Sequence, residues 1–173
     1  MQKFGLGVLV ALVCSAGVTY TAQKTDDQVL REVRDRAEIE DLMWRYTRAL
    51  DSTDAAAYAA VYTPDGQFGA GANATKGRDA LTKMVADLRA TRVANEAKGV
   101  RNAPMYHMTA NHAITFLDRD RARVDAYYLT AFGAAGQETP LRVAAVGRSV
   151  YELVRVNGRW LIKSRNVQPT AQD

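Results

Sequence analysis

The spacing of apolar residues changes once along this chain, near Met105, and the change limits the folds open to it. Before Met105, apolar side chains recur every three or four residues, as on one face of an α-helix. After it, runs rich in β-branched and aromatic residues alternate with turn residues, which is typical of strands. Helices followed by an antiparallel sheet predict an α+β domain, with the helices covering one face of the sheet.

Helical spacing in the first half predicts one long helix and two others. The long helix has Tyr46 on its apolar stripe, and an Asp-Ser-Thr-Asp run at residues 51–54 ends it and caps the next helix. Gly99 ends the third helix. The expected elements are helices at residues 26–50, 55–62 and 77–97, a turn at 63–66 and a short glycine-rich strand at 67–72.

Strand spacing in the second half is interrupted by clear turn signals. The strongest is Asn157-Gly158, because both residues accept the positive φ angles of a type I′ hairpin turn. The expected strands are residues 107–117, 122–132, 141–156 and 159–167.

The N-terminus has the layout of a signal peptide, which we expect to cover residues 1–22. Lys3 precedes an apolar run at residues 4–13 that is too short to span a bilayer, and small residues follow it. The only cysteine, Cys14, follows Val13, where a lipoprotein signal has a small residue, so a lipid anchor is the less favoured alternative. The sequence predicts an exported protein, periplasmic or secreted, with one domain at residues 26–168 and a tail at 169–173.

The charges of the chain argue against nucleic acid as a partner. The net charge is +4, but basic and acidic residues alternate, as in Arg31-Glu32-Val33-Arg34-Asp35-Arg36, which is typical of a solvated helix face. The two histidines do not form a zinc-binding pattern, and no P-loop, dinucleotide fingerprint or nucleophile motif is present. We therefore expect no metal, no cofactor, no nucleic acid and no membrane span.

Short motifs, in their order and spacing, carry a family resemblance. They are Arg45-Tyr46-Thr47-Arg48-Ala49-Leu50-Asp51, Tyr62-Thr63-Pro64-Asp65-Gly66, Gly77-Arg78-Asp79-Ala80-Leu81, His107 with Asn111, and Gly158-Arg159-Trp160-Leu161-Ile162 leading to Arg165. With these motifs the chain resembles the SnoaL-like branch of the nuclear transport factor two-like superfamily. The resemblance implies a cone-shaped barrel, in which a curved antiparallel sheet wraps on the long N-terminal helix around a deep pocket. The superfamily includes dehydratases, isomerases, cyclases and non-catalytic binding subunits.

The resemblance also implies a site. In the dehydratase members an aspartate just past the first long helix orients a histidine base, and Asp51 and His107 stand at those positions. Tyr46 matches a tyrosine of the bile acid dehydratase, five residues before the aspartate, and Arg165 matches an arginine near the end of the last strand. A histidine near pKa ~6.5 can accept a proton at neutral pH, and a carboxylate on its other ring nitrogen fixes the tautomer. Tyr46 would donate a proton to a leaving or enolate oxygen, and Arg165 would neutralise negative charge.

Strand alternation makes further expectations about side-chain direction. Arg165 falls on the face opposite Trp160, so it points away from the core unless a β-bulge intervenes. His112 is five residues from His107 and is expected on the other face, as a structural residue or as a contact of the outer face. The candidate substrate contacts are Asn111, Tyr127, Tyr128, Trp44 and Phe68.

Two functions from different classes follow. The first is a cofactor-independent lyase of the dehydratase type, or an isomerase, that acts on a small hydrophobic, steroid-like or polycyclic substrate. The alternative is a non-catalytic module on the same fold that binds small molecules or assembles with other subunits. The ordinary structural readings stay open as well: Tyr46 as core packing, Asp51 as a capping carboxylate, and Arg165 as a surface arginine. The resemblance further implies a homodimer or homotrimer.

Overall fold

The computed structural model describes residues 24–134 and 140–168; the expected signal peptide and the C-terminal tail lie outside these residues. The elements in chain order are α1 (Asp26–Asp51), α2 (Ala55–Ala60), β1 (Tyr62–Phe68), the 3-10 turn η1 (Gly71–Asn73), β2 (Thr75–Lys76), α3 (Arg78–Ala97), β3 (Met105–Phe116), β4 (Arg121–Phe132), β5 (Arg142–Val156) and β6 (Arg159–Gln168). The change from helices to strands near Met105 is as expected.

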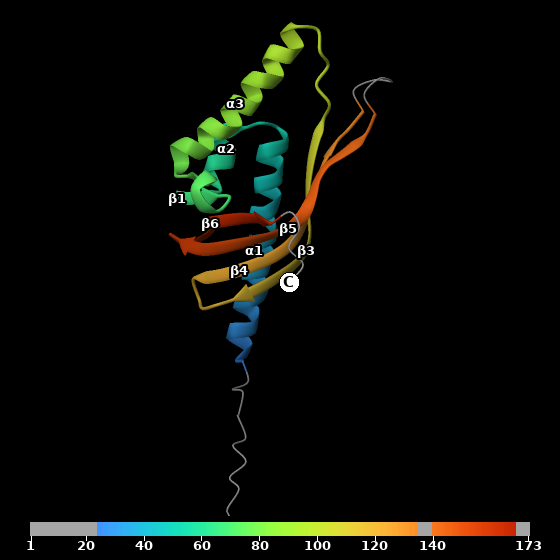
Figure 1. Ribbon diagram of the computed structural model, residues 1–173. Helices are drawn as coiled ribbons and strands as arrows, with labels where there is room; N and C mark the ends of the chain where they lie inside the picture. The colour runs from blue at the N-terminus through green and yellow to red at the C-terminus, as the bar shows by residue number, and fades with distance from the viewer. Residues whose placement is uncertain (1–23, 135–139, 169–173) are drawn as a thin grey trace, which may run out of the picture.

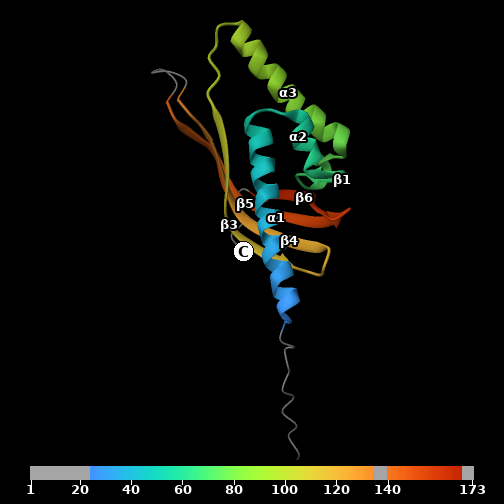
Figure 2. The ribbon, with the colours of Figure 1, turned by 180° about the vertical axis from the view of Figure 1, so that it is seen from behind.

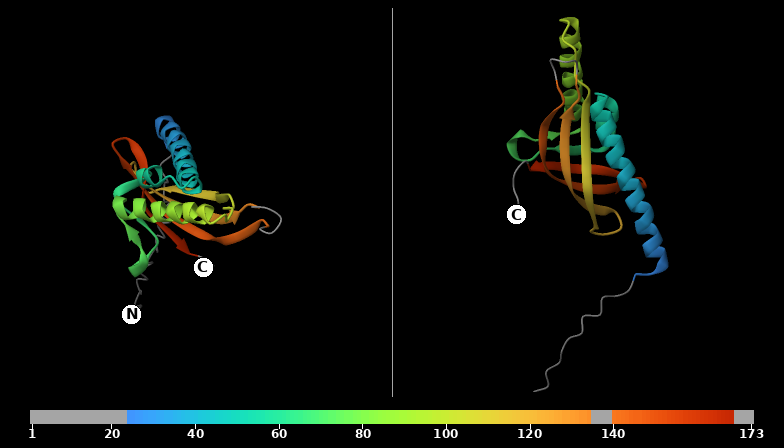
Figure 3. Two further views of the ribbon diagram at one scale, coloured as in Figure 1. Left: turned by 90° about the horizontal axis from the view of Figure 1, so that it is seen from above. Right: turned by 90° about the vertical axis from the view of Figure 1, so that its right-hand side faces the viewer.

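The sheet is mixed and open, which corrects the expectation of an antiparallel barrel. Its strand order is β2-β1-β6-β5-β4-β3, and β1 runs parallel to β6, while the other pairs are antiparallel. The two edge strands, β2 and β3, are at opposite ends of this order, so the described strands do not close into a barrel. The predicted α+β class and the curved sheet wrapped on the long helix are confirmed. Figure 3 shows how strongly the sheet twists between β3 and β6.

The three α-helices of the described residues lie on one side of the sheet. α1 crosses the inner face of the curved sheet, and α2 and α3 lie over the end that holds β1 and β2 (Figures 1 and 2). α1 starts with a capping box between Thr25 and Gln28, which satisfies backbone N–H groups of its first turn. Its buried stripe of apolar side chains packs on the sheet and forms the core; the stripe consists of Ile39, Leu42, Met43, Tyr46 and Ala49.

The first strand begins earlier than the sequence pattern predicts. α2 ends at Ala60, and β1 starts at Tyr62, so the turn expected at residues 63–66 lies inside a strand. Tyr62 is fully buried and pairs with Ile162, and the register then shifts before Gln67. Pro64 lies within this shift, and because proline has no N–H to donate, an irregular stretch accommodates it.

The β5–β6 hairpin has the turn that Asn157-Gly158 predicts. The φ angles of the two residues are +50° and +77°, and Val156 pairs with Arg159 across the turn. This hairpin places β6, and with it Arg165, next to β5 in the middle of the sheet.

Candidate active site

His107 and Asp51 form a hydrogen-bonded pair between β3 and the C-terminal end of α1. Nδ1 of His107 lies 2.7 Å from Oδ1 of Asp51, and the backbone N–H of His107 donates to the same oxygen at 2.9 Å. Both side chains are largely shielded from solvent, with exposed fractions of 16% for His107 and 27% for Asp51. Two bonds to one carboxylate oxygen hold the position of the ring as well as its tautomer.

This arrangement leaves one ring nitrogen for chemistry. With Nδ1–H donating to Asp51, the neutral imidazole presents Nε2 as a proton acceptor. Burial lowers the pKa of His107 below its ordinary value of 6.5; the hydrogen bond and charge of Asp51 oppose this shift, and the charge of Arg165 adds to it. The ring is therefore neutral at neutral pH, which is the state that a general base requires.

Arg165 is buried on the inner face, and a β-bulge puts it there. Along β6, Ile162 pairs with Leu153 but Ser164 pairs with Glu152, so Lys163 is an extra residue that has no partner of its own. The bulge reverses the alternation after Ile162, and Arg165 is only 4% exposed. Strict alternation would have turned it outward.

The Arg165 guanidinium lies among aromatic rings. It donates a hydrogen bond to the hydroxyl of Tyr46, and its Cζ lies 4.9 Å from the centroid of that ring. Three more rings surround it, at 5.3 Å for Tyr151, 5.5 Å for Tyr128 and 5.6 Å for Phe68. In the described part of the chain, the guanidinium has no carboxylate within ion-pair distance.

Buried phenols flank this cation, and sequence reasoning missed most of them. Tyr58 and Tyr62 share a hydrogen bond of 3.1 Å, and the ring of Tyr58 lies 5.4 Å from that of Tyr46. Burial raises the pKa of all three phenols, so they stay protonated at neutral pH and can donate hydrogen bonds. In the sequence, the only indication of these phenols was the spacing of four residues between Tyr58 and Tyr62, which is typical of one helix face. A single pair of aromatic residues at this spacing does not distinguish a functional site from a packed core.

The five proposed substrate contacts divide into two groups. Phe68 and Tyr128 face the interior beside Arg165. Tyr127 is wrong as an interior contact, because it is 55% exposed and alternates with Tyr128 on the opposite face. Asn111 does not share the face of His107, because it is exposed, with φ +55°, at a bulge where β3 shifts register against β4. Trp44 is 67% exposed and lines a groove outside the core.

The same bulge corrects the expectation for His112. Because Asn111 takes up the extra position, His112 returns to the side that His107 occupies. Both histidines line a groove of about 320 Å³ between α1 and β3. The Nε2 atom of His112 is buried with no hydrogen-bond partner among the described residues, and burial lowers the pKa of this ring. The groove is lined by Glu40, Met43, Trp44, Thr47, His107, Met108, Thr109 and His112.

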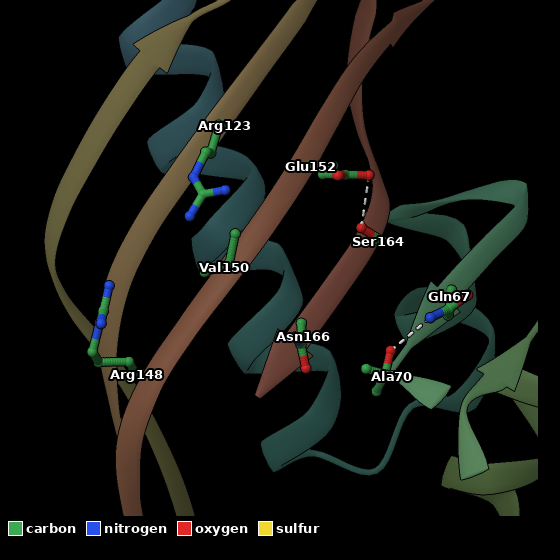
Figure 4. Close-up of a pocket in the computed structure, with 9 residues that line it drawn as sticks. Gln67, Ala70, Arg123, Arg148, Val150, Glu152, Ser164 and Asn166 are labelled. Atoms are coloured by element: carbon green, nitrogen blue, oxygen red, sulfur yellow. Dashed lines mark hydrogen bonds between the residues drawn. The ribbon is translucent and has the colours of Figure 1, made fainter. Parts of the chain in front are cut away.

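A second hollow, of about 500 Å³, lies on the outer face of the sheet (Figure 4). Val150 and Glu152 point into it, whereas their neighbour Tyr151 is buried on the inner face. Its side chains are engaged with one another: Ser164 donates to Glu152 at 3.1 Å, and Gln67 donates to the carbonyl of Gly69 at 2.7 Å. Because Tyr151 alternates with Val150 and Glu152 along β5, this hollow lies on the face opposite to Arg165.

Metal ligands and membrane spans are not found in the described residues. Within residues 24–134 and 140–168, no three His, Cys, Asp or Glu side chains gather closely enough to hold a metal ion. None of the helices described here is both long and apolar enough to cross a bilayer.

A SnoaL-like domain profile matches residues 31–166, which include Asp51, His107 and Arg165. The chain belongs to the SnoaL-like family. No protein with a curated function matches the sequence significantly.

Solved structures agree on the family fold. A protein of unknown function from Mycobacterium tuberculosis aligns with a TM-score of 0.69 at 20% identity, over 83% of this chain and 76% of its own. A candidate scytalone dehydratase from Novosphingobium aromaticivorans aligns at 0.65 and 24% identity, over 83% and 89%. A Catenulispora acidiphila protein in complex with S-DNPA aligns at 0.61 and 27% identity, over 78% and 92%. The first two similarities show the shared SnoaL-like fold alone.

Proposed function

We propose that this SnoaL-like protein is a cofactor-independent acid–base enzyme, a lyase of the dehydratase type or an isomerase. The observation that carries the proposal is the 2.7 Å hydrogen bond between His107 and Asp51. A shielded imidazole with a lowered pKa and an oriented Nε2 suits abstraction of a proton next to a carbonyl group. A general base contributes roughly 10²–10⁴-fold to such a step.

Tyr46 and Arg165 would handle the charge that proton abstraction creates. As the proton moves to Nε2 of His107, negative charge develops on the carbonyl oxygen of the substrate, as an enolate. Arg165 would stabilise this oxygen electrostatically, and the Tyr46 hydroxyl, which accepts from Arg165, keeps its own proton to donate. In a dehydratase the enolate would then expel the β-hydroxyl group, which would take the proton from Nε2 of His107 and leave as water. In an isomerase His107 would return the proton to another carbon.

The proposed substrate is a small hydrophobic molecule, of the steroid-like or polycyclic class. Aromatic side chains from three strands, Phe68, Tyr128 and Tyr151, surround the position of Arg165. Flat ring systems stack favourably on such side chains. The dehydratase name of one structural relative is in line with this proposal, although its 24% identity shows only the fold.

The decisive experiment uses the two histidines of the chain as a matched pair. A panel of steroid-like and polycyclic ketones and β-hydroxy ketones is incubated with the protein in D₂O, and deuterium uptake and water loss are followed by mass spectrometry. We expect His107→Ala to retain the fold and to lose about 10²-fold or more in rate, and His112→Ala to lose much less.

Equal turnover by the wild type and His107→Ala would refute the enzyme proposal. The alternative, a binding module, predicts that compounds of the panel bind without exchange, and that their affinity hardly depends on His107 or Asp51. A thermal-shift measurement of the same panel on the same variants distinguishes the two.

We also propose that the protein is exported. The layout of residues 1–22 supports this proposal, and these residues lie outside the described structure. N-terminal sequencing of the protein recovered from the native host tests it: a mature start between residues 17 and 23 is expected, and an intact N-terminus would contradict it.

A further inference from the structure

Five polar side-chain atoms are buried without a hydrogen-bond partner among the described residues, and three of them belong to adjacent residues on the inner face of β5 and β6. These three are Oγ of Ser149, the hydroxyl of Tyr151 and Nε of Arg165. These residues are 1%, 0% and 4% exposed, respectively. A buried polar group without a partner is destabilising, and most such groups in folded proteins are paired. Three on two neighbouring strands point to a missing partner that they share.

The strand register places the three residues next to one another. Tyr151 of β5 is directly opposite Arg165 of β6, a pairing that brings Cβ atoms within about 5 Å. Ser149 is two positions before Tyr151 on the same face and is a diagonal neighbour of Arg165, at a typical separation of roughly 7–8 Å. The next inner-face position along β5 is Gly147, which adds no side chain. The three side chains therefore project from adjacent positions on one face of the sheet.

The side chains of all three residues can donate hydrogen bonds, and one of them, Arg165, is a cation. The guanidinium N–H of Arg165 and the hydroxyls of Ser149 and Tyr151 are hydrogen-bond donors. Burial of a cation is strongly destabilising unless an anion compensates the charge. The four rings around Arg165 stabilise it in part, but in the described residues no carboxylate does so. The complementary partner is a negatively charged oxygen.

We propose that Ser149, Tyr151 and Arg165 form an oxyanion-binding site, and that the substrate places there a carboxylate or an enolate-type oxygen. The inference rests on the proposed function, because it places the anionic end of the substrate of His107. Tyr46 and Asp51 are five positions apart on α1 and bind Arg165 and His107, respectively, so the base and the anion site lie along the same helix. Ser149 and Tyr151 thus become binding residues that neither strand patterning nor the family motifs indicated.

The test measures binding of small aromatic probes by isothermal titration calorimetry. The probes are 2-naphthoate, its neutral amide 2-naphthamide, and 2-naphthol at pH values below and above its ionisation. We expect 2-naphthoate, or ionised 2-naphthol, to bind at least 10-fold more tightly than the neutral probes. Preference for 2-naphthoate assigns a carboxylate, and preference for ionised 2-naphthol assigns an enolate-type oxygen.

Matched variants locate the anion. Tyr151→Phe and Ser149→Ala each remove one hydroxyl, and each should lower the affinity for the preferred anion about 10-fold, as loss of a hydrogen bond to a charged group does. The controls Tyr127→Phe and Ser164→Ala make the same changes on the outer face and should leave the affinity unchanged. Circular dichroism confirms that the variants are folded.

Equal affinity for 2-naphthoate, ionised 2-naphthol and 2-naphthamide would overturn the inference, since a water molecule would then satisfy the three atoms. Anion affinity that is unchanged in both Tyr151→Phe and Ser149→Ala would overturn the inference as well.

The variant His107→Ala separates the failure of the anion site from the failure of the proposed enzyme function. If that variant keeps anion affinity but the wild type shows no proton exchange, the proposed enzyme fails and the anion site stands. If proton exchange depends on His107 but charged and neutral probes bind with equal affinity, only the anion site fails.

Discussion

The backbone N–H and the ring Nδ1 of His107 both bind the same carboxylate oxygen of Asp51, at 2.9 and 2.7 Å. The pair joins the edge strand β3 to the end of α1, across 56 positions of sequence. An imidazole held in this way cannot rotate without breaking a bond, so its orientation is set before any substrate binds.

The first prediction concerns the protonation of this ring. Because burial and the Arg165 charge lower the His107 pKa while Asp51 raises it, we expect the wild-type ring to titrate below 6.5. Arg165→Met should raise this pKa, and Asp51→Asn should lower it further. Imidazole NMR titration measures these values directly, since the chain has two histidines and His112→Gln assigns the signals. A wild-type His107 pKa above 6.5 would contradict the prediction.

The same shift predicts how stability depends on pH. A histidine whose folded-state pKa is lowered binds fewer protons in the folded state than in the unfolded state. Its contribution to the free energy of unfolding is therefore complete above 6.5 and is lost as the pH falls through the folded-state pKa. Urea unfolding between pH of about 7 and about 5 should give a smaller decline for His107→Gln than for the wild type. Parallel curves for the two proteins would contradict it.

A third prediction contrasts two buried arginine contacts. Arg165 has no described carboxylate partner, so Arg165→Met removes a buried cation and fills its space with an apolar chain. We expect the free energy of unfolding to fall by no more than about 1 kcal/mol, while anion binding is lost. The matched change is Asp35→Ala, which removes the buried partner of Arg155 and leaves its two exposed partners, Glu38 and Asp120. It should cost more than Arg165→Met, but less than the roughly 3–5 kcal/mol of a buried charge left without any partner. Chemical denaturation measures both, and a large loss in Arg165→Met would make Arg165 a structural residue.

The fourth prediction is a homodimer or homotrimer. Tyr127 and Val146 lie on the outer side of β4 and β5, together with Met108 of β3, and each of the three is at least 50% exposed. Such exposed apolar positions on adjacent strands suit an interface. Light scattering after size exclusion should give two or three times the mass of one chain, and Tyr127→Glu with Val146→Glu should reduce it to the monomer. A wild-type monomer would contradict the prediction.

Local sequence patterns determine much of the fold. The apolar stripe with Tyr46, the capping run at residues 51–54 and the Asn157-Gly158 turn act over a few residues, and each determines an element within one or two positions of its bounds. The pairing partner of β1 is different. A parallel neighbour at Ile162 depends on a strand one hundred positions later, and no local pattern encodes it.

The candidate site depended on two irregularities. The bulge at Lys163 turns Arg165 inward, and the bulge at Asn111 turns Asn111 out and His112 back toward α1. Alternation of residues predicts a side chain's face only while the register holds, and one extra residue reverses every position that follows it. The sequence by itself therefore determined the helices, most of the strands, the family and the residue types at the site. Only the tertiary structure decided which of those residues meet, because the inserted residues are recognisable only against the partner strands with which they fail to pair.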